Sequence, residues 1–278
     1  MLKTIKNSLC IILSLLVLAV CCACSMGRVE NAGTSAKQND TGSNIVRVTF
    51  PEGFTVSQIA QRLEENGVCS AAEFTGAVND TENLEKYGIE IDSPSERAFL
   101  LEGYLFPDTY DFYIGEKVSS VIRKFVVNFN SQITEEMRTR AAELGYSLDE
   151  IIAIASIIQE EADVLSEMPR VSAVLHNRLA SPEFPKLQCD ACTFYLRDSV
   201  RPYISESDYE RYLQTYSTYN CTGLPEGPIT NPGIEAVKAA LYPSDDNYYF
   251  FVTDANNTYY YAETYSEHLE NCKIAGIQ

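Results

Sequence analysis

Residues 147–162, SLDEIIAIASIIQEEA, contain the most strongly apolar helical pattern that follows the N-terminal leader of the chain. Ser147 begins a capping box with Glu150, which predicts that a helix starts here. The run from Ile151 to Ala162 is almost free of polar residues until its end. We therefore expect this helix to be mostly buried in the core of the fold.

A carboxylate continues the apolar stripe of this helix. Glu161 is spaced i+7, i+4 and i+3 after the three isoleucines Ile154, Ile157 and Ile158. Glu160 instead follows a more polar face, which contains Asp149, Ala153 and Ser156. A carboxyl group that packs against apolar side chains keeps its proton near neutral pH and can act as a general acid. We therefore expect Glu161 to face a cleft. The alternative is that the stripe ends at Ile158 and Glu161 is solvated.

The sequence on either side of this helix predicts an α+β fold. Before it, a strand pattern at 46–50 and two short capped helices, beginning near Thr55 and Ser70, indicate a small α/β module. After it come an extended Gly- and Pro-rich loop at 223–233 and a β-hairpin at 248–263. Further helices are predicted at residues 118–129, 135–144, 168–179 and 234–241.

These patterns divide the chain into four segments. They are an export or anchor segment at 1–24, a flexible tether at 25–44, the small module with an aromatic connector at 45–112, and a mixed helical domain ending in the hairpin at 113–278. The composition of the tether does not offset the entropy of ordering it, so we expect disorder there. Pro107 argues against a helix in the connector.

The N-terminal segment allows three interpretations. Lys3 and Lys6 precede an uncharged, apolar run, which is typical of a segment that enters the membrane. The run LAVCCACS resembles a bacterial lipobox, in which Cys24 would be lipidated, because Ala23 precedes it and Ser25 follows it. The run is also long enough for a single-span anchor, and a cleaved signal peptide is the third possibility. All three place the remaining chain outside the cytoplasm.

Charge and hydropathy argue against two broad classes of protein. The 278 residues include 21 basic and 39 acidic side chains, giving a net charge of −18, which disfavours binding to nucleic acid. After the leader there is no apolar run of about 20 residues, which excludes a multi-pass membrane protein.

The cysteine pattern does not define a metal site. Of nine cysteines, Cys10, Cys21, Cys22 and Cys24 lie in the leader, and an odd number remains. Cys189 and Cys192 form a CxxC, typical of a redox pair or half a zinc site. No second CxxC accompanies it, and His176 and His268 lack ligand spacing. We interpret these cysteines as incidental thiols or one local disulfide, and we expect no metal.

A single general acid on an extracytoplasmic scaffold favours cleavage of a glycosidic bond. Hydrolases normally use two carboxylates, whereas a lytic enzyme needs one, because a hydroxyl of the sugar itself attacks the anomeric carbon. The sequence has no GxSxG, P-loop or GxGxxG motif, so we expect neither a serine hydrolase of that type nor a nucleotide cofactor.

Five segments of the sequence resemble the MltG-type endolytic murein transglycosylase (YceG-like) family. In chain order they are EGYLFPDTY at 102–110, ASIIQEEA at 155–162, HNRL at 176–179 with LQCD at 187–190, TYNCTGLPEGPITNPG at 218–233, and TYSEH at 264–268. The module at 46–80 is similar to the family's LysM-like subdomain. The resemblance implies a LysM-like module followed by a mixed helical catalytic domain.

The resemblance also implies roles for individual residues. Glu161 matches the family's catalytic Glu, in agreement with the stripe. Gln188 and Asp190 would bind sugar or peptide groups near the cleaved bond, and Tyr219 and Asn231 would line the same cleft. Structural alternatives remain open: Asp190 would cap a turn, Asn231 would precede Pro232 in a turn, and Tyr219 would lie in the core.

The sequence departs from the family pattern at a few positions of the same motifs. Gln159 stands where the family often has an acidic residue, and Ser217 where it usually has Asn. Ala191 and Cys192 follow Asp190 in place of the common Pro and small residue. The changes at Ser217, Ala191 and Cys192 concern substrate contacts rather than the type of reaction.

The implied activity is endolytic cleavage of the MurNAc-GlcNAc β-1,4 bond of peptidoglycan, leaving 1,6-anhydro-MurNAc ends and terminating nascent glycan strands. The implied setting is the extracytoplasmic face of the cell membrane, with peptidoglycan synthases as partners. No metal, cofactor or nucleic acid is implied. Two other functions remain open: a catalytically inactive peptidoglycan-binding lipoprotein, and a solute-binding lipoprotein, for which the mature chain is short.

Overall fold

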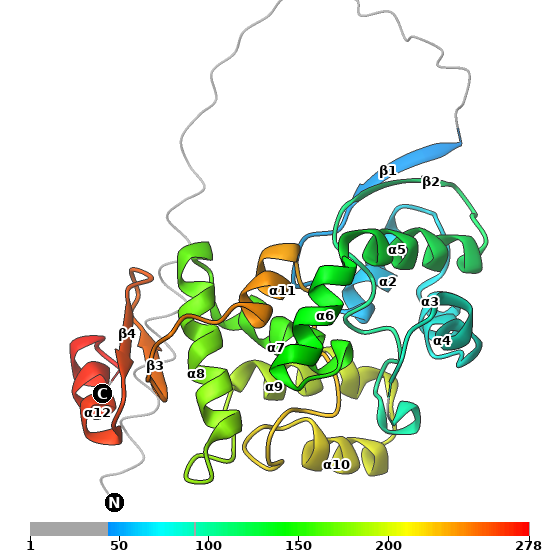
Figure 1. The fold of residues 1–278 in the computed structure, drawn as a ribbon. Coiled ribbons are helices and arrows are strands. Elements are labelled where there is room, and N and C mark those ends of the chain that lie inside the picture. The colour runs from blue at the N-terminus through cyan, green and yellow to red at the C-terminus, as the bar shows by residue number, and fades with distance from the viewer. Residues whose placement is uncertain (1–43, 92, 278) are drawn as a thin grey trace, which may run out of the picture. The chain divides into compact units, whose positions relative to one another are not determined.

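The computed structural model describes residues 44–91 and 93–277 (Figure 1). Our predictions for the leader, for Cys24 and for the tether fall on residues 1–43 and lie outside the described residues. Residues 44–278 form one compact unit. Within the two described ranges, no helix has both the length and the apolar character needed to cross a bilayer.

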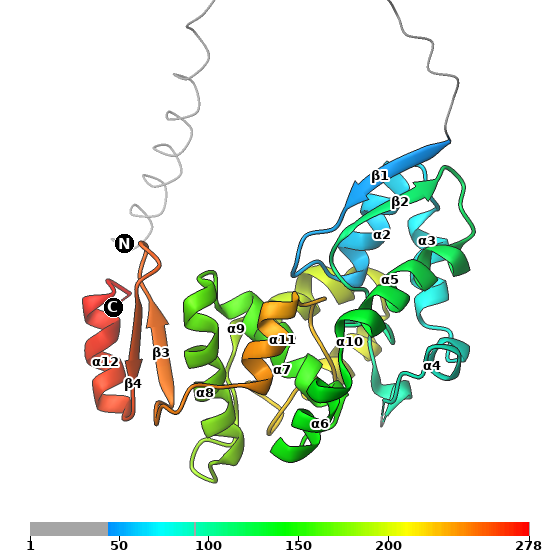
Figure 2. The ribbon, with the colours of Figure 1, turned by 45° about the horizontal axis from the view of Figure 1, so that its top comes forward.

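Two strands distant in sequence hold the N-terminal module together. Strand β1 (Ile45–Thr49) pairs antiparallel with β2 (Thr109–Tyr113), and Val48 lies opposite Tyr110. Figures 1 and 2 show these strands side by side above α2 and α5. The sequence excluded a helix near Pro107 but did not predict this strand, because its partner is about 60 residues away.

The predicted helices of the module are present and are capped as expected. Helices α2 (Val56–Glu65) and α3 (Ala71–Val78) begin with capping boxes at Thr55 and Ser70. Phe50 from the strand side packs edge-on against Phe125 of α5 (Val118–Gln132), with ring centroids 4.9 Å apart. Two short elements, α4 (Glu82–Tyr87) and η1 (Pro94–Glu96), complete this half of the fold, and α6 (Glu135–Leu144) follows α5 in the chain.

Helix α7 (Leu148–Glu161) lies at the centre of the fold. Its capping box at Ser147 is present, and every residue from Ile151 to Ile158 is buried. It packs against α6, α8 (Met168–Ala180) and α11 (Ile234–Leu241), and the short η2 (Leu165–Glu167) connects α7 to α8. The prediction of a buried helix is confirmed.

The more polar face of α7 is also buried. Ser156 is fully buried, and its hydroxyl donates to the carbonyl of Ala153 and accepts the N–H of Ile229. Ile229 belongs to the extended loop at 223–233, so this face of the helix packs against that loop. Gly103 also requires close packing here, since a Cβ on it would lie 2.7 Å from Ile152. Ser156 on the more polar face therefore makes an internal hydrogen-bonded contact.

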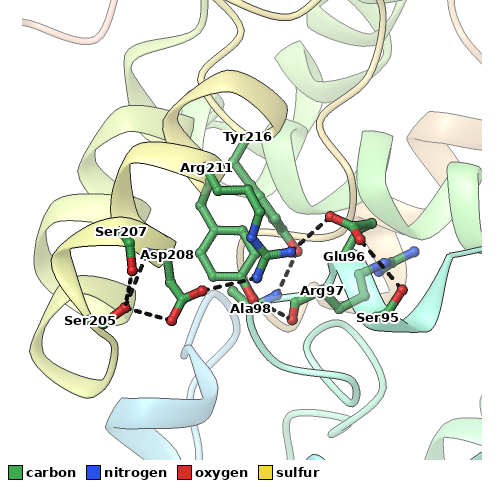
Figure 3. Close-up of polar contacts among 10 residues, drawn as sticks. Ser95, Glu96, Arg97, Ala98, Ser205, Ser207, Asp208, Arg211 and Tyr216 are labelled. Atoms are coloured by element: carbon green, nitrogen blue, oxygen red, sulfur yellow. Dashed lines mark hydrogen bonds and ion pairs between the residues drawn. The ribbon is translucent and has the colours of Figure 1, made fainter.

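The segment between α8 and α11 is mostly short helical turns. They are α9 (Asp190–Phe194), the π-helical η3 (Tyr195–Val200), η4 (Arg201–Tyr203) and α10 (Glu206–Thr215). Figure 3 shows how α10 attaches to the module: Arg211 joins Asp208 to Glu96, and the N–H of Ala98 donates to the hydroxyl of Tyr216.

The C-terminal hairpin is present as predicted. Strands β3 (Phe250–Thr253) and β4 (Tyr259–Ala262) pair antiparallel, and α12 (Tyr265–Ile274), which the sequence patterns did not predict, packs on both. Figure 2 shows this unit beside α8. The described chain is therefore a mixed α+β fold, mostly helical with two small sheets.

Candidate active site

Glu161 is the last residue of α7, where the central helix reaches the hairpin. The hydroxyl of Tyr259 in β4 donates to the carbonyl of Glu161 at 3.3 Å and accepts the N–H of Asp163 at 3.1 Å. These bonds satisfy backbone groups that a helix end leaves without partners. The hairpin thereby fixes the end of the helix and, with it, the position of the Glu161 side chain.

The surroundings of Glu161 suit a general acid at neutral pH. Burial raises the pKa of its carboxyl group to about 7, and the nearby charges of Asp190 and Glu160 act in the same direction. A hydrogen bond from the N–H of Ala191 opposes this rise. Near neutral pH the group is about half protonated, so it can give up a proton and later take one back.

Two open clefts meet at Glu161. The hairpin-side cleft, about 580 Å³, is lined by the ends of α7 and α8, residues 187–190, Tyr219, both hairpin strands and α12. The module-side cleft, about 320 Å³, is lined by Gly53, Thr55 and Gln58 of the module together with α9, η3 and Thr230. Glu160, Glu161 and Asp190 line both clefts. A linear ligand lying through both would pass over Glu161.

Three of the four predicted binding residues lie in the hairpin-side cleft with Glu161. Gln188, Asp190 and Tyr219 are all exposed there. The hydroxyl of Tyr219 donates a 2.8 Å hydrogen bond to Asp190. Gln188 has a positive φ of 57°, unusual for a side chain other than glycine, and its N–H donates to the carbonyl of Thr218. Tyr219 is thus an exposed residue of the cleft and not a core residue.

Asn231 does not line either cleft, so its predicted position is wrong. It is 1% exposed, and its amide nitrogen donates to Glu102 and to the carbonyl of Phe54, both at 2.8 Å. Its amide oxygen accepts the N–H groups of Gly103 and Leu105. All its hydrogen-bonding capacity is therefore used inside the protein, and Asn231 holds the turn at 53–54 that borders the module-side cleft.

Glu160 also lies in the clefts, contrary to the expectation that it faces away from Glu161. Its carboxylate lies over Gly53, where an added Cβ would be 2.7 Å from Oε1. Burial raises the pKa of Glu160, although Glu160 is more exposed than Glu161. The helix ends at this point, so neighbouring residues can turn toward the same opening.

Sequence reasoning assigned no role to several residues of the hairpin-side cleft. Arg178, Phe250, Tyr259 and His268 line it, although HNRL and TYSEH were recognised as motifs. Their spacing in the sequence gives no sign that they approach Glu161. Arg178, the cation within the HNRL motif, was the one residue whose charge could have indicated a role in the cleft. Thr55 and Gln58 were likewise predicted only as a helix start.

The described cysteines are free thiols, and Cys189 and Cys192 are both buried. Burial raises the pKa of the Cys189 thiol well above its usual range. His176 lies apart from the clefts, where its Nε2 is 2.9 Å from the carbonyl oxygen of Ala240. Among residues 44–91 and 93–277, no group of three or more His, Cys, Asp or Glu side chains is arranged to hold a metal ion.

Comparisons with known proteins define the class of this chain. The sequence profile of the YceG-like family matches residues 29–274, so the chain belongs to the YceG-like family. A crystal structure of a yceG-like protein from Listeria monocytogenes superposes with a TM-score of 0.68 at 27% identity, covering 81% of this chain and 75% of that one.

Two relatives carry the name endolytic murein transglycosylase. The Bacillus subtilis protein is 28% identical over 80% of this chain and 63% of its own length. The Streptococcus pneumoniae protein is 25% identical over 87% of this chain and 46% of its own length. The matched region thus spans less than two thirds of either relative.

Proposed function

We propose that this chain is an endolytic peptidoglycan lytic transglycosylase. The observation that carries the proposal is the position of Glu161, a carboxyl group with a pKa of about 7 at the junction of two open clefts. The names of the two relatives support the same activity.

In the proposed reaction Glu161 acts twice. Protonated Glu161 donates its proton to the glycosidic oxygen as the bond from the muramyl C1 breaks. The resulting carboxylate then takes the proton of the C6 hydroxyl of the same muramyl residue, and that oxygen attacks C1. The products are a 1,6-anhydro-MurNAc end and a free GlcNAc hydroxyl, and no water is consumed. Glu161 ends the cycle protonated, as it began.

The two clefts support the proposed endolytic character. Both are open, and they extend in different directions from Glu161, toward the hairpin and toward the module. Sugar units on both sides of the cleaved bond therefore have a surface to occupy, which is the requirement for cutting within a strand. Asp190 and Tyr219 would contact the substrate on the hairpin side, together with Gln188.

We further propose the biological setting that the sequence predicts. The segment at 45–112 would be a LysM-like module that helps to bind glycan, with the catalytic domain at 113–278. An N-terminal lipid anchor at Cys24 or a single span would hold the chain at the extracytoplasmic face of the membrane. There it would terminate nascent strands made by peptidoglycan synthases.

The experiment that tests this proposal is digestion of purified glycan strands by the full chain and by its Glu161→Gln variant. Gln is nearly isosteric with Glu but exchanges no proton, so cleavage should fall by about 10⁴-fold or more. Glu160→Gln should cost less than about tenfold. If the wild type binds strands but cuts none, the chain is the inactive peptidoglycan-binding protein; if Glu160→Gln is the inactive variant, Glu160 is the catalytic acid.

A further inference from the structure

The guanidinium of Arg178 is a buried cation at the edge of the hairpin-side cleft. The residue is 7% exposed and lies in the last turn of α8. Its Nε donates to the carbonyl of Tyr249 at 2.7 Å, and its Nη1 donates to the carbonyls of Leu187 and Lys186 at 2.8 and 3.1 Å. Nη1 also lies 3.3 Å from Oε1 of Gln188. These bonds hold the guanidinium rigidly between residues 186–188 and the hairpin.

This buried cation has no carboxylate partner among the described residues. Arg97, the other buried arginine among the described residues, forms an ion pair with Asp149. Arg178 forms none, and its bonds are all to uncharged groups. A buried charge without a counter-ion is costly, so a site that keeps one is suited to an anion supplied by a ligand.

Nη2 of Arg178 makes no hydrogen bond within the described part of the chain. This atom is also not fully buried. Its two N–H groups are therefore available from the cleft that the residue lines. The rings of Phe250 and Phe184 lie 5.0 and 5.8 Å from the guanidinium carbon and offset part of its charge. The titratable neighbours supply no negative charge, because burial raises the pKa of Tyr219 to about 12 and lowers the pKa of His268. Both are neutral near pH 7.

We propose that Arg178 binds a carboxylate on the muramyl residue of the glycan through Nη2, and that it selects muramyl glycans over uncharged ones. In a strand of alternating GlcNAc and MurNAc, only the MurNAc units carry a carboxylate-bearing substituent, either the lactyl group itself or the peptide attached to it. Glu160, Glu161, Asp163 and Asp190 also line this cleft and repel anions. One fixed cation in an acidic cleft thus sets where the anion can lie. This inference rests on the proposed function.

The test measures strand binding, so it does not depend on cleavage. The protein is the full chain carrying Glu161→Gln, which keeps the strands intact during the measurement. The probes are glycan strands with peptides and strands stripped of them, each also prepared with its carboxylates blocked as methylamides. Blocking should weaken binding by about tenfold or more, as expected for loss of a charge-assisted hydrogen bond. If blocking weakens the binding of the stripped strands, the anion that Arg178 binds is the lactyl carboxylate. If blocking weakens the binding of the peptide-bearing strands only, the anion is a peptide carboxylate.

The matched variants are Arg178→Gln and Arg178→Lys, each added to Glu161→Gln. Arg178→Gln should bind blocked and unblocked strands equally, and Arg178→Lys should keep part of the difference. Arg123 is exposed on α5, and Arg123→Gln also removes one positive charge. This variant should keep the full difference in binding between blocked and unblocked strands. Equal binding of blocked and unblocked strands by the Arg178-containing protein would overturn the proposal, even if every variant of Arg178 failed to fold. Absence of cleavage by the wild type, with the binding difference intact, would instead count against the proposed function alone.

Discussion

Asp190 lies beside Glu161 where the two clefts meet, and its charge helps to raise the pKa of Glu161. Tyr219 holds Asp190 in place with a 2.8 Å hydrogen bond. Asp190 is the first residue of α9, and the N–H of the next residue donates to Glu161. One short helical turn therefore supplies both the charge that keeps the acid protonated and the hydrogen bond that orients it.

The pH dependence of kcat/KM should follow the protonation of Glu161. Its pKa of about 7 predicts that cleavage falls about tenfold per pH unit above about pH 7, because only the protonated form can donate to the leaving oxygen. A pH–rate profile on soluble strands measures this. A profile that stays flat from about pH 6 to 9 would contradict the assignment.

Asp190→Asn should lower the pKa of Glu161, because it removes a negative charge that favours the protonated form. We expect the midpoint of the pH–rate profile to move down by about one unit. Tyr219→Phe is the control, since it removes the hydrogen bond to Asp190 but keeps the charge. A midpoint that does not move in Asp190→Asn would show that burial alone raises the pKa.

Glu161 should make the protein less stable as the pH rises. Its folded-state pKa of about 7 exceeds the ordinary value of 4.5, so the folded state binds more protons than the unfolded state between these values. Stability is then lost between about pH 4.5 and 7, by about 3 kcal/mol in total. Glu161→Gln should therefore unfold at higher urea than the wild type at about pH 8. The two should differ far less at about pH 4, and an equal difference at both pH values would contradict this linkage.

Local patterns predicted most of the helices and the C-terminal hairpin, whereas the cleft residues Gln188, Asp190 and Tyr219 were predicted only from the family resemblance. The capping boxes at Ser70 and Ser147 and the hairpin around 254–257 depend on neighbouring residues, so the sequence suffices to find them. The pairing of β1 with β2 and the approach of Gln58 to the clefts depend on contacts between distant segments, for which periodicity gives no signal.

Asn231 shows why the remaining part of the site was misassigned. A polar residue in a Gly- and Pro-rich motif was expected to contact substrate, yet its partners are Glu102 and backbone groups of the module. Hydrogen bonds between distant segments have no sequence signature. By contrast Glu161 could be found because the helix stripe and the family resemblance both select it, although the stripe alone left a solvated position open.

Asn231→Ala should destabilise the fold rather than act on substrate binding. It removes four side-chain hydrogen bonds and leaves the buried Glu102 carboxyl group without one of its donors. We expect a loss of about 3 kcal/mol or more in urea unfolding. Asn220→Ala, which removes one exposed hydrogen bond, should cost less than about 1 kcal/mol. A stable Asn231→Ala protein with a raised KM would restore the original prediction of a substrate contact.

The chemistry of the newly formed glycan ends tests the central claim most directly. The full chain is incubated with purified strands, and the masses of the muramyl ends are measured. Attack by the C6 hydroxyl predicts 1,6-anhydro-MurNAc ends, each one water molecule lighter than a reducing end, and none of these should form with Glu161→Gln. Reducing MurNAc ends would show that water is the nucleophile, that a second carboxylate such as Asp190 or Glu160 takes part, and that the proposed mechanism is wrong.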